Sequence, residues 1–141
     1  MRFLLDTNVL VSAALFPTGT PGRAYDLALT TSHDIVVCDY SVDEMRRVFQ
    51  TKFPAHLDAL ERFLGAMQPG ITIVEAPEHV TGVDVETVRD PKDWPIVRAA
   101  IGCQADVIIT GDKDLLEAML PFPMMLTPAQ FLRMLQQVEP G

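Results

Sequence analysis

The sequence has little of three residue types that often identify a small protein at once. Only two cysteines, three histidines and one tryptophan occur among 141 residues. Cys38 and Cys103 lie in or beside apolar segments, and neither has a cysteine or histidine at ligand-like spacing. This pattern favours buried free thiols in a reducing compartment over a disulfide framework.

Long hydrophobic runs are also missing. No apolar stretch approaches the roughly 18 residues of a membrane-spanning helix, which predicts no membrane span. The first residues lack a basic region followed by a long apolar stretch and a small-residue cleavage site. We therefore expect no secretory signal and a cytoplasmic location.

Basic residues are outnumbered, with 11 Lys and Arg against 19 Asp and Glu, for a net charge of −8. Proteins that bind nucleic acid through many phosphate contacts are usually basic, which argues against a general nucleic-acid coat. Two interpretations of the acidic balance stay open. It keeps the protein soluble, or it gathers carboxylates into a metal site that works with a basic partner.

Composition is otherwise that of an ordinary globular domain, with 48% hydrophobic and 21% charged residues. There is no internal repeat and no low-complexity tract. We expect one domain over residues 1–138, with 139–141 as a frayed C-terminus.

Short apolar runs alternate with segments of helical periodicity. The predicted strands are Phe3–Leu5, Ile35–Cys38, Ile71–Val74, Val107–Ile109 and Met124–Leu126. The predicted helices are 21–30, a helix from Ser41 that opens with a capping box to Glu44, 55–67, 93–103, a short one in "KDLLEAML", and 128–138 after Thr127. This order predicts an α/β fold with a central, mostly parallel β-sheet of about five short strands flanked by helices.

Carboxylates follow several of these strands. Asp6 comes directly after the first strand, Glu44 lies in the first turn of the helix after the second, Asp93 opens a helix, and Asp112 and Asp114 follow the strand in "DVIIT". In an open α/β sheet, ligands bind outside the carboxyl ends of the strands. Carboxylates without histidine or cysteine suit Mg²⁺ or Mn²⁺. Because such a cation activates water and stabilises a scissile phosphate, the pattern predicts a metal-dependent phosphodiesterase.

Each acid also has a purely structural alternative at a helix N-terminus. Asp6 and Asp112 would cap the helices that follow them, with Asp114 in solvent. Glu44 would only complete a capping box, and Asp43 competes with it for the functional role. The remaining acids with this alternative are Asp90 and Asp93.

Four segments carry a family resemblance: "LLDTNVLVSA", "SVDEM", "RDPKDWPIVRAAI" and "VIITGDKDLL". In this order and at these spacings they resemble the PIN domain, the fold of the VapC-type ribonuclease toxins. The resemblance runs from Arg2 to about Leu132. It implies a parallel sheet whose edge gathers acids around Mg²⁺ or Mn²⁺, in an endoribonuclease that hydrolyses RNA phosphodiester bonds.

Carried over residue by residue, the four acids of the family are Asp6, Glu44, Asp93 and Asp112. Asp114 is a close helper or a substitute for Asp112, and the sequence leaves open which of the two matters more. Because "SVDEM" is a short match, the assignment of Glu44 rests mainly on its position in the helix after the second strand.

The resemblance also implies supporting roles for other residues. Asn8 is expected to orient Asp6 by a hydrogen bond, Thr110 to contact a metal-bound water or a phosphate, and Asp90 to be a loop or cap residue. Trp94 either stacks on a base or packs under its loop, and packing is favoured. The basic residues that would hold the RNA backbone, unless they are merely solvated, are Lys92, Lys113, Arg46, Arg47 and Arg89.

The resemblance also implies partners, namely a cognate antitoxin protein and a second copy of the chain in a homodimer. Two other functions stay open. An aspartate-dependent phosphatase would use Asp6 as nucleophile, but it usually needs a second acid at position 8, where this chain has Asn8. A non-catalytic PIN-like module would bind RNA or protein without turnover.

Overall fold

A computed structural model describes residues 1–67 and 69–137, and it contains one five-stranded sheet. The strands are β1 (Arg2–Leu5), β2 (Asp34–Cys38), β3 (Ile71–Val74), β4 (Val107–Ile109) and β5 (Met124–Leu126). Their order is β3-β2-β1-β4-β5, and all four neighbouring pairs are parallel. The predicted parallel α/β architecture is confirmed, and each predicted strand is found within one residue of its expected start. Residues 139–141, expected to be a frayed C-terminus, lie outside the described part together with residue 138.

Helices connect the strands. They are α1 (Thr7–Leu15), α2 (Thr20–Ala28), α3 (Asp39–Lys52), α4 (Leu57–Met67), α5 (Trp94–Gly102), α6 (Lys113–Leu116) and α7 (Pro128–Gln136). Short 3-10 turns cover Pro54–His56, Val85–Thr87 and Pro91–Asp93. Within the described ranges, none of these helices has the length and apolarity needed to cross a bilayer.

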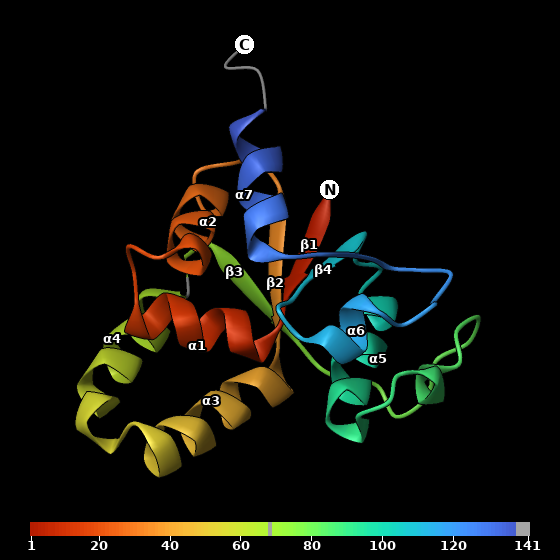
Figure 1. The fold of residues 1–141 in the computed structure, drawn as a ribbon, viewed down its shortest axis with the longest axis horizontal. Helices are drawn as coiled ribbons and strands as arrows, with labels where there is room; N and C mark the ends of the chain where they lie inside the picture. The colour runs from red at the N-terminus through yellow and green to blue at the C-terminus, as the bar shows by residue number, and fades with distance from the viewer. Residues whose placement is uncertain (68, 138–141) are drawn as a thin grey trace.

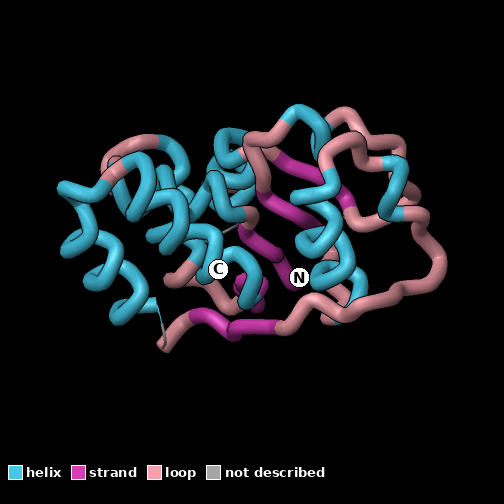
Figure 2. Tube along the Cα trace, turned by 90° about the horizontal axis from the view of Figure 1, so that it is seen from below, coloured by secondary structure: helices cyan, strands magenta, loops and turns pink. Residues whose placement is uncertain are grey.

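Successive side chains of a strand point to opposite sides of the sheet, and the central strands β1, β2 and β4 are buried on both faces over Phe3–Leu5, Ile35–Cys38 and Val107–Ile109. The edge strands β3 and β5 are partly exposed. Phe3 and Leu5 of β1 pack into a large core with α1, α2, α3, α4 and α7. Leu4, between them, packs into a smaller core with α5 and α6. Figures 1 and 2 show the sheet between these two unequal groups of helices. This two-sided burial explains why the strands read as continuous apolar runs.

The carboxyl ends of β1 and β4 lie level at the centre of the sheet. Leu5 is in register with Ile109, and the backbone N–H of Asp6 donates to the Ile109 carbonyl at 2.9 Å. The chain order reverses between these two strands, since β1 continues toward β2 on one side and β4 toward β5 on the other. Such a switch point is where open α/β sheets bind ligands.

One predicted helix start is wrong. The helix after β2 begins at Asp39 rather than Ser41, and Cys38 is its N-cap without a side-chain hydrogen bond. β2 therefore passes directly into α3, which leaves no loop for a capping box. Ser41 is fully buried, and its Oγ accepts a hydrogen bond from Thr7 Oγ1 at 2.9 Å. This bond joins α3 to the first turn of α1.

The two thiols differ in their surroundings. Cys38 is buried, and burial raises the pKa of its thiol to about 12. Cys103 is only partly buried, which corrects the expectation that both are buried. Both thiols are free.

The start of α7 yields a stability prediction. Thr127 Oγ1 accepts from the Gln130 backbone N–H at 3.1 Å, and Gln130 Oε1 accepts from the Thr127 N–H at 2.9 Å. Thr127→Ala should lower the free energy of unfolding by about 1 kcal/mol, because it removes one side of this capping box. Urea unfolding measures the change, and Thr81→Ala, at an exposed bend, should change it by less than about 0.5 kcal/mol. Equal effects of the two substitutions would contradict the capping role.

Candidate metal centre

The four acids that the sequence singled out line one open pocket of about 370 Å³. Asp6 comes from the end of β1, Glu44 from α3, Asp93 from the start of α5, and Asp112 from the loop before α6. Asp90 is a fifth acid in the same lining. The fold thus brings together side chains that lie up to about a hundred residues apart in the chain.

Asp6 is buried at the floor of this pocket, with 4% of its surface exposed. Its Oδ1 accepts from the Thr7 backbone N–H at 2.8 Å, and its Oδ2 accepts from Thr110 Oγ1 at 2.7 Å. The pKa of Asp6 is raised to about 6: burial is the main cause, the two hydrogen bonds oppose the shift, and the charges of Asp112 and Glu44 add to it. Asp6 therefore caps α1 and also belongs to the acid cluster, so the structural and functional interpretations hold together.

Asp93 is buried among like charges without a full set of partners. It is 7% exposed, and within the described residues its Oδ2 has no hydrogen-bond partner. Burial, followed by hydrogen bonding to Asp112 and the charge of Asp112, raises the pKa of Asp93 well above its usual range. Buried polar atoms without a partner are rare in native proteins and need an explanation.

A divalent cation fits this donor set. The acidic residues that line the pocket are all aspartates and one glutamate, and no histidine or cysteine of the described chain contributes to the lining. Each oxygen of Asp6 accepts one hydrogen bond and keeps a free lone pair. Asp93 Oδ2 has both of its lone pairs free. Hard oxygen ligands of this kind are those that Mg²⁺ and Mn²⁺ prefer.

Thr110 connects two of the acids. Its hydroxyl donates to Asp6 Oδ2 and accepts from the backbone N–H of Asp112 at 2.9 Å, and its side chain is fully buried. Asp112 Oδ1 in turn accepts from the Asp114 N–H at 2.8 Å and so caps α6. The Thr110 hydroxyl thus fixes Asp6 relative to Asp112, and its contact with a metal-bound water or a phosphate stays a prediction.

Glu44 reaches the pocket because α3 is fixed against α1. The Thr7–Ser41 hydrogen bond holds the helix one turn before Glu44. Residues three apart on a helix share a face, so Glu44 points toward the same side as Ser41. Its charge contributes to the raised pKa of Asp6. Asp43, its rival in the sequence, is exposed and lines a different pocket with Asp39 and Arg46.

The hydrogen bond expected from Asn8 to Asp6 is absent among the described residues. Asn8 Oδ1 instead accepts from the backbone N–H of Gly111 at 3.2 Å, and Asp6 takes its hydrogen bonds from Thr7 and Thr110. From the first turn of α1, Asn8 reaches across to the loop after β4. It therefore joins α1 to the loop that carries Asp112.

A second group of acids overlaps the first. Carboxylate oxygens of Asp90, Asp93 and Asp114 all lie within 4.8 Å of one another. Asp90 does cap its turn, accepting from the Lys92 N–H at 3.0 Å, but it also belongs to this group, which sequence reasoning missed. The spacing of Asp90 and Asp93 was the available signal, because residues three apart across a 3-10 turn lie on the same side.

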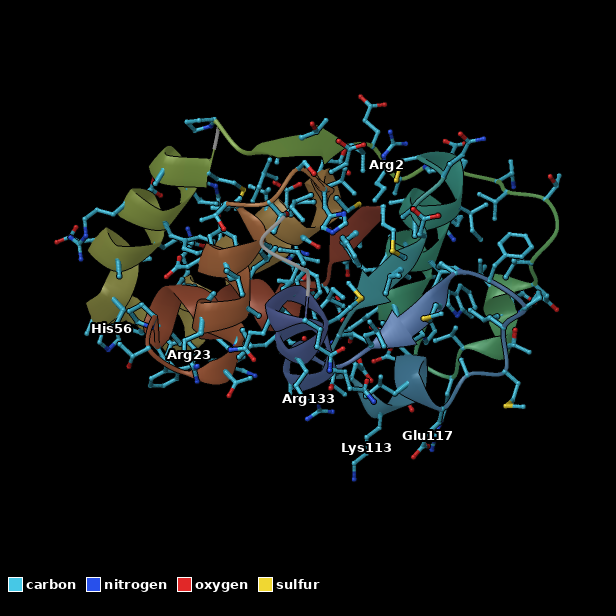
Figure 3. All side chains as sticks on the ribbon, turned by 90° about the horizontal axis from the view of Figure 1, so that it is seen from above. Arg2, Arg23, His56, Lys113, Glu117 and Arg133 are labelled. Atoms are coloured by element: carbon cyan, nitrogen blue, oxygen red, sulfur yellow. The ribbon has the colours of Figure 1, made fainter. Side chains whose placement is uncertain are left out.

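The lysines expected to hold RNA are placed differently from one another. Lys92 lines the acid pocket. Lys113 does not line it, and Figure 3 shows its side chain extending from the outer surface. Lys52, at the end of α3, also lines the pocket, and it was not predicted from the sequence.

Two of the arginines are engaged outside the pocket. Arg46 forms an ion pair with Glu61 at 2.6 Å. The guanidinium of Arg47 lies 5.7 Å from the centre of the Tyr40 ring. Arg89, the third, forms an ion pair with Asp114 of the second group.

Trp94 packs under its loop, as favoured from the sequence. Its indole N–H donates to the Val88 carbonyl at 2.8 Å, and the residue is partly buried. Val88 is fully buried in the smaller core. This contact anchors the segment that carries Asp90 and Asp93.

The position of Thr110 gives a further prediction. Thr110→Val keeps the shape of the side chain but removes a donor to Asp6 and an acceptor for the Asp112 N–H. We expect a loss of about 1–3 kcal/mol in the free energy of unfolding, together with weaker Mn²⁺ binding. Thr110→Ser retains the hydroxyl and should keep most of both. If the valine and serine variants behave alike in unfolding and calorimetry, the bridging role is wrong.

The sheet, the switch point and the acid pocket define an α/β domain with a candidate metal centre, and comparison with known proteins gives its family. A family model described as PIN domain matches residues 2–114, so the chain belongs to the PIN domain family. It is 27% identical over 121 residues to Uncharacterized protein MJ1680 of Methanocaldococcus jannaschii, covering 82% of this chain and 74% of that protein.

A solved structure shares the fold. It is a chain of the crystal structure of VapBC2 from Rickettsia felis bound to a DNA fragment from their promoter. The match has a TM-score of 0.63 at 15% sequence identity, and covers 90% of this chain and 98% of that chain. The central parallel sheet flanked by helices is therefore a VapC-like PIN fold.

Proposed function

We propose that this protein is a divalent-metal-dependent endoribonuclease, with Mg²⁺ or Mn²⁺ as its cofactor. The observation that carries the proposal is the unpartnered, buried Oδ2 of Asp93, which lies in a pocket lined by Asp6, Glu44 and Asp112. Burial first, and then the charges of neighbouring carboxylates, raise the pKa of both Asp6 and Asp93, and a cation would relieve both costs.

The residues divide the work as follows. Asp6, Glu44, Asp93 and Asp112 would hold the cation, with Asp114 in reach of Asp93 at the rim. When bound, the cation would supply a more acidic water and stabilise charge on the phosphate. Thr110 keeps Asp6 and Asp112 in place. The two lysines of the pocket, Lys52 and Lys92, would bind the phosphates that flank the scissile bond.

A toxin–antitoxin role is the second part of the proposal. The similar fold occurs in a complex named VapBC2, and the net charge of −8 suits a basic inhibitory partner. We propose a cognate antitoxin, a cytoplasmic location and a homodimer or higher homo-oligomer. Copurification with the product of a neighbouring reading frame, followed by light scattering, tests all the partner statements at once.

The function is tested by comparing wild type with the double variant Asp6→Asn/Asp93→Asn. Calorimetry should show Mn²⁺ binding to wild type and none to the variant, and only wild type should cleave a mixed RNA pool in Mn²⁺. Circular dichroism checks that the variant folds. Cleavage by the double variant at the wild-type rate would refute the site, and equal Mn²⁺ binding by both proteins would refute the cation assignment.

Two other functions make different predictions. The phosphatase alternative needs an acid at position 8, but Asn8 uses its amide oxygen to hold Gly111, so trapping a phosphoryl group on Asp6 is not expected. The non-catalytic alternative predicts Mn²⁺ binding without turnover on any RNA. The unpartnered oxygen of Asp93 points to cation binding in both cases, so turnover of RNA is the measurement that separates the enzyme from the binding module.

A further inference from the structure

Arg89 makes an ion pair at the rim of the acid cluster that the proposed mechanism does not use. Its Nε lies 3.1 Å from Asp114 Oδ1, and its Nη2 lies 4.0 Å from Glu117 Oε2. The Arg89 side chain is 78% exposed, whereas that of Asp114 is 26% exposed. The pair thus joins a solvent-exposed cation to a partly buried acid.

The backbone on both sides of this ion pair is fixed. Val88, next to Arg89, is buried and accepts from the Trp94 indole, and Asp90 caps the following turn. Asp114 lies in the first turn of α6, where its N–H donates to Asp112 Oδ1. Rearrangement at this point therefore falls to the two side chains.

Asp114 is placed between two possible counter-ions. One of its oxygens lies within 4.8 Å of oxygens of Asp90 and Asp93, close enough for one cation to contact all three. Its Oδ1 is held by the Arg89 guanidinium. A guanidinium and a divalent cation would neutralise the same carboxylate, so binding of one reduces the gain from binding the other.

We propose that Arg89 is a positioning residue that competes with the cation for Asp114 and so lowers the cation affinity of the site. In the metal-free protein, Arg89 is the counter-ion of Asp114. When the cation takes up Asp114, the guanidinium is released to solvent. This inference rests on the proposed function, because it needs a cation at the acid cluster.

The ordinary interpretation is an exposed ion pair with no consequence for the site. Exposed pairs contribute little to stability, and a positive charge near the acids would weaken cation binding a little wherever it stood. Competition predicts more than this general repulsion, because it depends on the Asp114 carboxylate in particular. A double-mutant cycle between the two residues separates the two interpretations.

The experiment measures Mn²⁺ affinity by calorimetry for wild type, Arg89→Gln, Asp114→Asn and the double variant. Arg89→Gln should bind Mn²⁺ about fivefold to tenfold more tightly than wild type. In the Asp114→Asn background, the same substitution should change the affinity by less than about twofold. Lys113→Gln is the charge control, since Lys113 is adjacent to Asp114, points outward in Figure 3 and has no ion pair among the described residues. It should also change the affinity by less than about twofold.

Each other outcome contradicts the inference in a distinguishable way. If Arg89→Gln and Lys113→Gln have equal effects, or the Arg89 effect persists without Asp114, Arg89 acts only through its general charge. If Arg89→Gln weakens binding, Arg89 presents Asp114 to the cation rather than competing for it. In these cases the proposed cation site stands, whereas absence of Mn²⁺ binding by wild type refutes the proposed function itself.

Discussion

Asp93→Asn is expected to abolish RNA cleavage and, in the same protein, to increase the stability of the metal-free fold. At pH 8 the free energy of unfolding without metal should rise by about 1–3 kcal/mol. Cleavage in Mn²⁺ should fall more than about a hundredfold, since even the outer partners of metal ligands are worth ~10–100-fold. Urea unfolding in EDTA and a single-turnover RNA assay measure the two effects.

The opposite signs have one cause. Asp93 is buried beside Asp112, and burial and that neighbour raise its pKa. Ionising it in the folded state is therefore costly without a cation. An asparagine at this position carries no charge, and its amide N–H should donate to the Asp112 carboxylate, which adds to the hydrogen bond from the Asp114 N–H. The feature that destabilises the empty site is thus the feature that binds the cation.

Asp43→Asn is the matched control for this experiment. Asp43 is an exposed acid next to Glu44 on α3, and it does not line the acid pocket. Its substitution should change the free energy of unfolding by less than about 0.5 kcal/mol and leave cleavage unchanged. If Asp93→Asn destabilises the protein, Asp93 is a structural cap. If Asp43→Asn loses cleavage activity, Asp43 rather than Glu44 is the functional acid of α3.

The sheet was predictable because burial on both faces leaves a clear mark on the sequence. Runs such as Ile35–Cys38 and Val107–Ile109 have no polar side chain, and each forms a parallel strand. The acids were predictable for a related reason. A carboxylate that directly follows such a strand lies at the carboxyl edge of the sheet, which places Asp6 and Asp112 together before any contact is known.

The hydrogen bonds inside the site were not predictable in this way. Thr110 and Asp6 are 104 residues apart, and nothing in the local sequence of either indicates the other. Asn8 was assigned to Asp6 by proximity in the chain, but the side chain crosses to Gly111 instead. Hydrogen bonds across strands depend on the register of the sheet, and periodicity does not give that register.

The predicted start of the helix at Ser41 was wrong for a different reason. Ser41 has the spacing of a capping box with Glu44, but the strand before it continues to Cys38 and the helix begins at once. The same motif type is real at Thr127, where a proline follows and the chain leaves the sheet. At Ser41 the helix has already begun two residues earlier, so the serine side chain bonds Thr7 instead of a helix N-terminus. Thr127, by contrast, is the single residue between β5 and α7 and is therefore free to act as the N-cap.

The free energy of unfolding of the metal-free protein is expected to depend strongly on pH. The pKa of Asp6 is raised from 3.8 to about 6 in the folded state. The folded protein therefore binds this proton more tightly than the unfolded chain. The free energy of unfolding should fall as the pH rises from about 4 to about 6, and stay lower above that range. The shift corresponds to about 3 kcal/mol for Asp6, and the raised pKa of Asp93 extends the fall to higher pH.

Asp6→Asn isolates the contribution of Asp6. The variant has no proton to lose at this position, so the difference in free energy of unfolding, variant minus wild type, should grow by about 2–3 kcal/mol between pH 4 and pH 7. Urea unfolding in EDTA across this range measures it. Saturating Mn²⁺ at pH 7 should restore stability to wild type by linkage and leave the variant nearly unchanged. If the free energies of unfolding of the two proteins change with pH in parallel, the pKa of Asp6 is not raised in the folded state. The interpretation of Asp6 as a buried carboxylate that binds the cation would then be wrong.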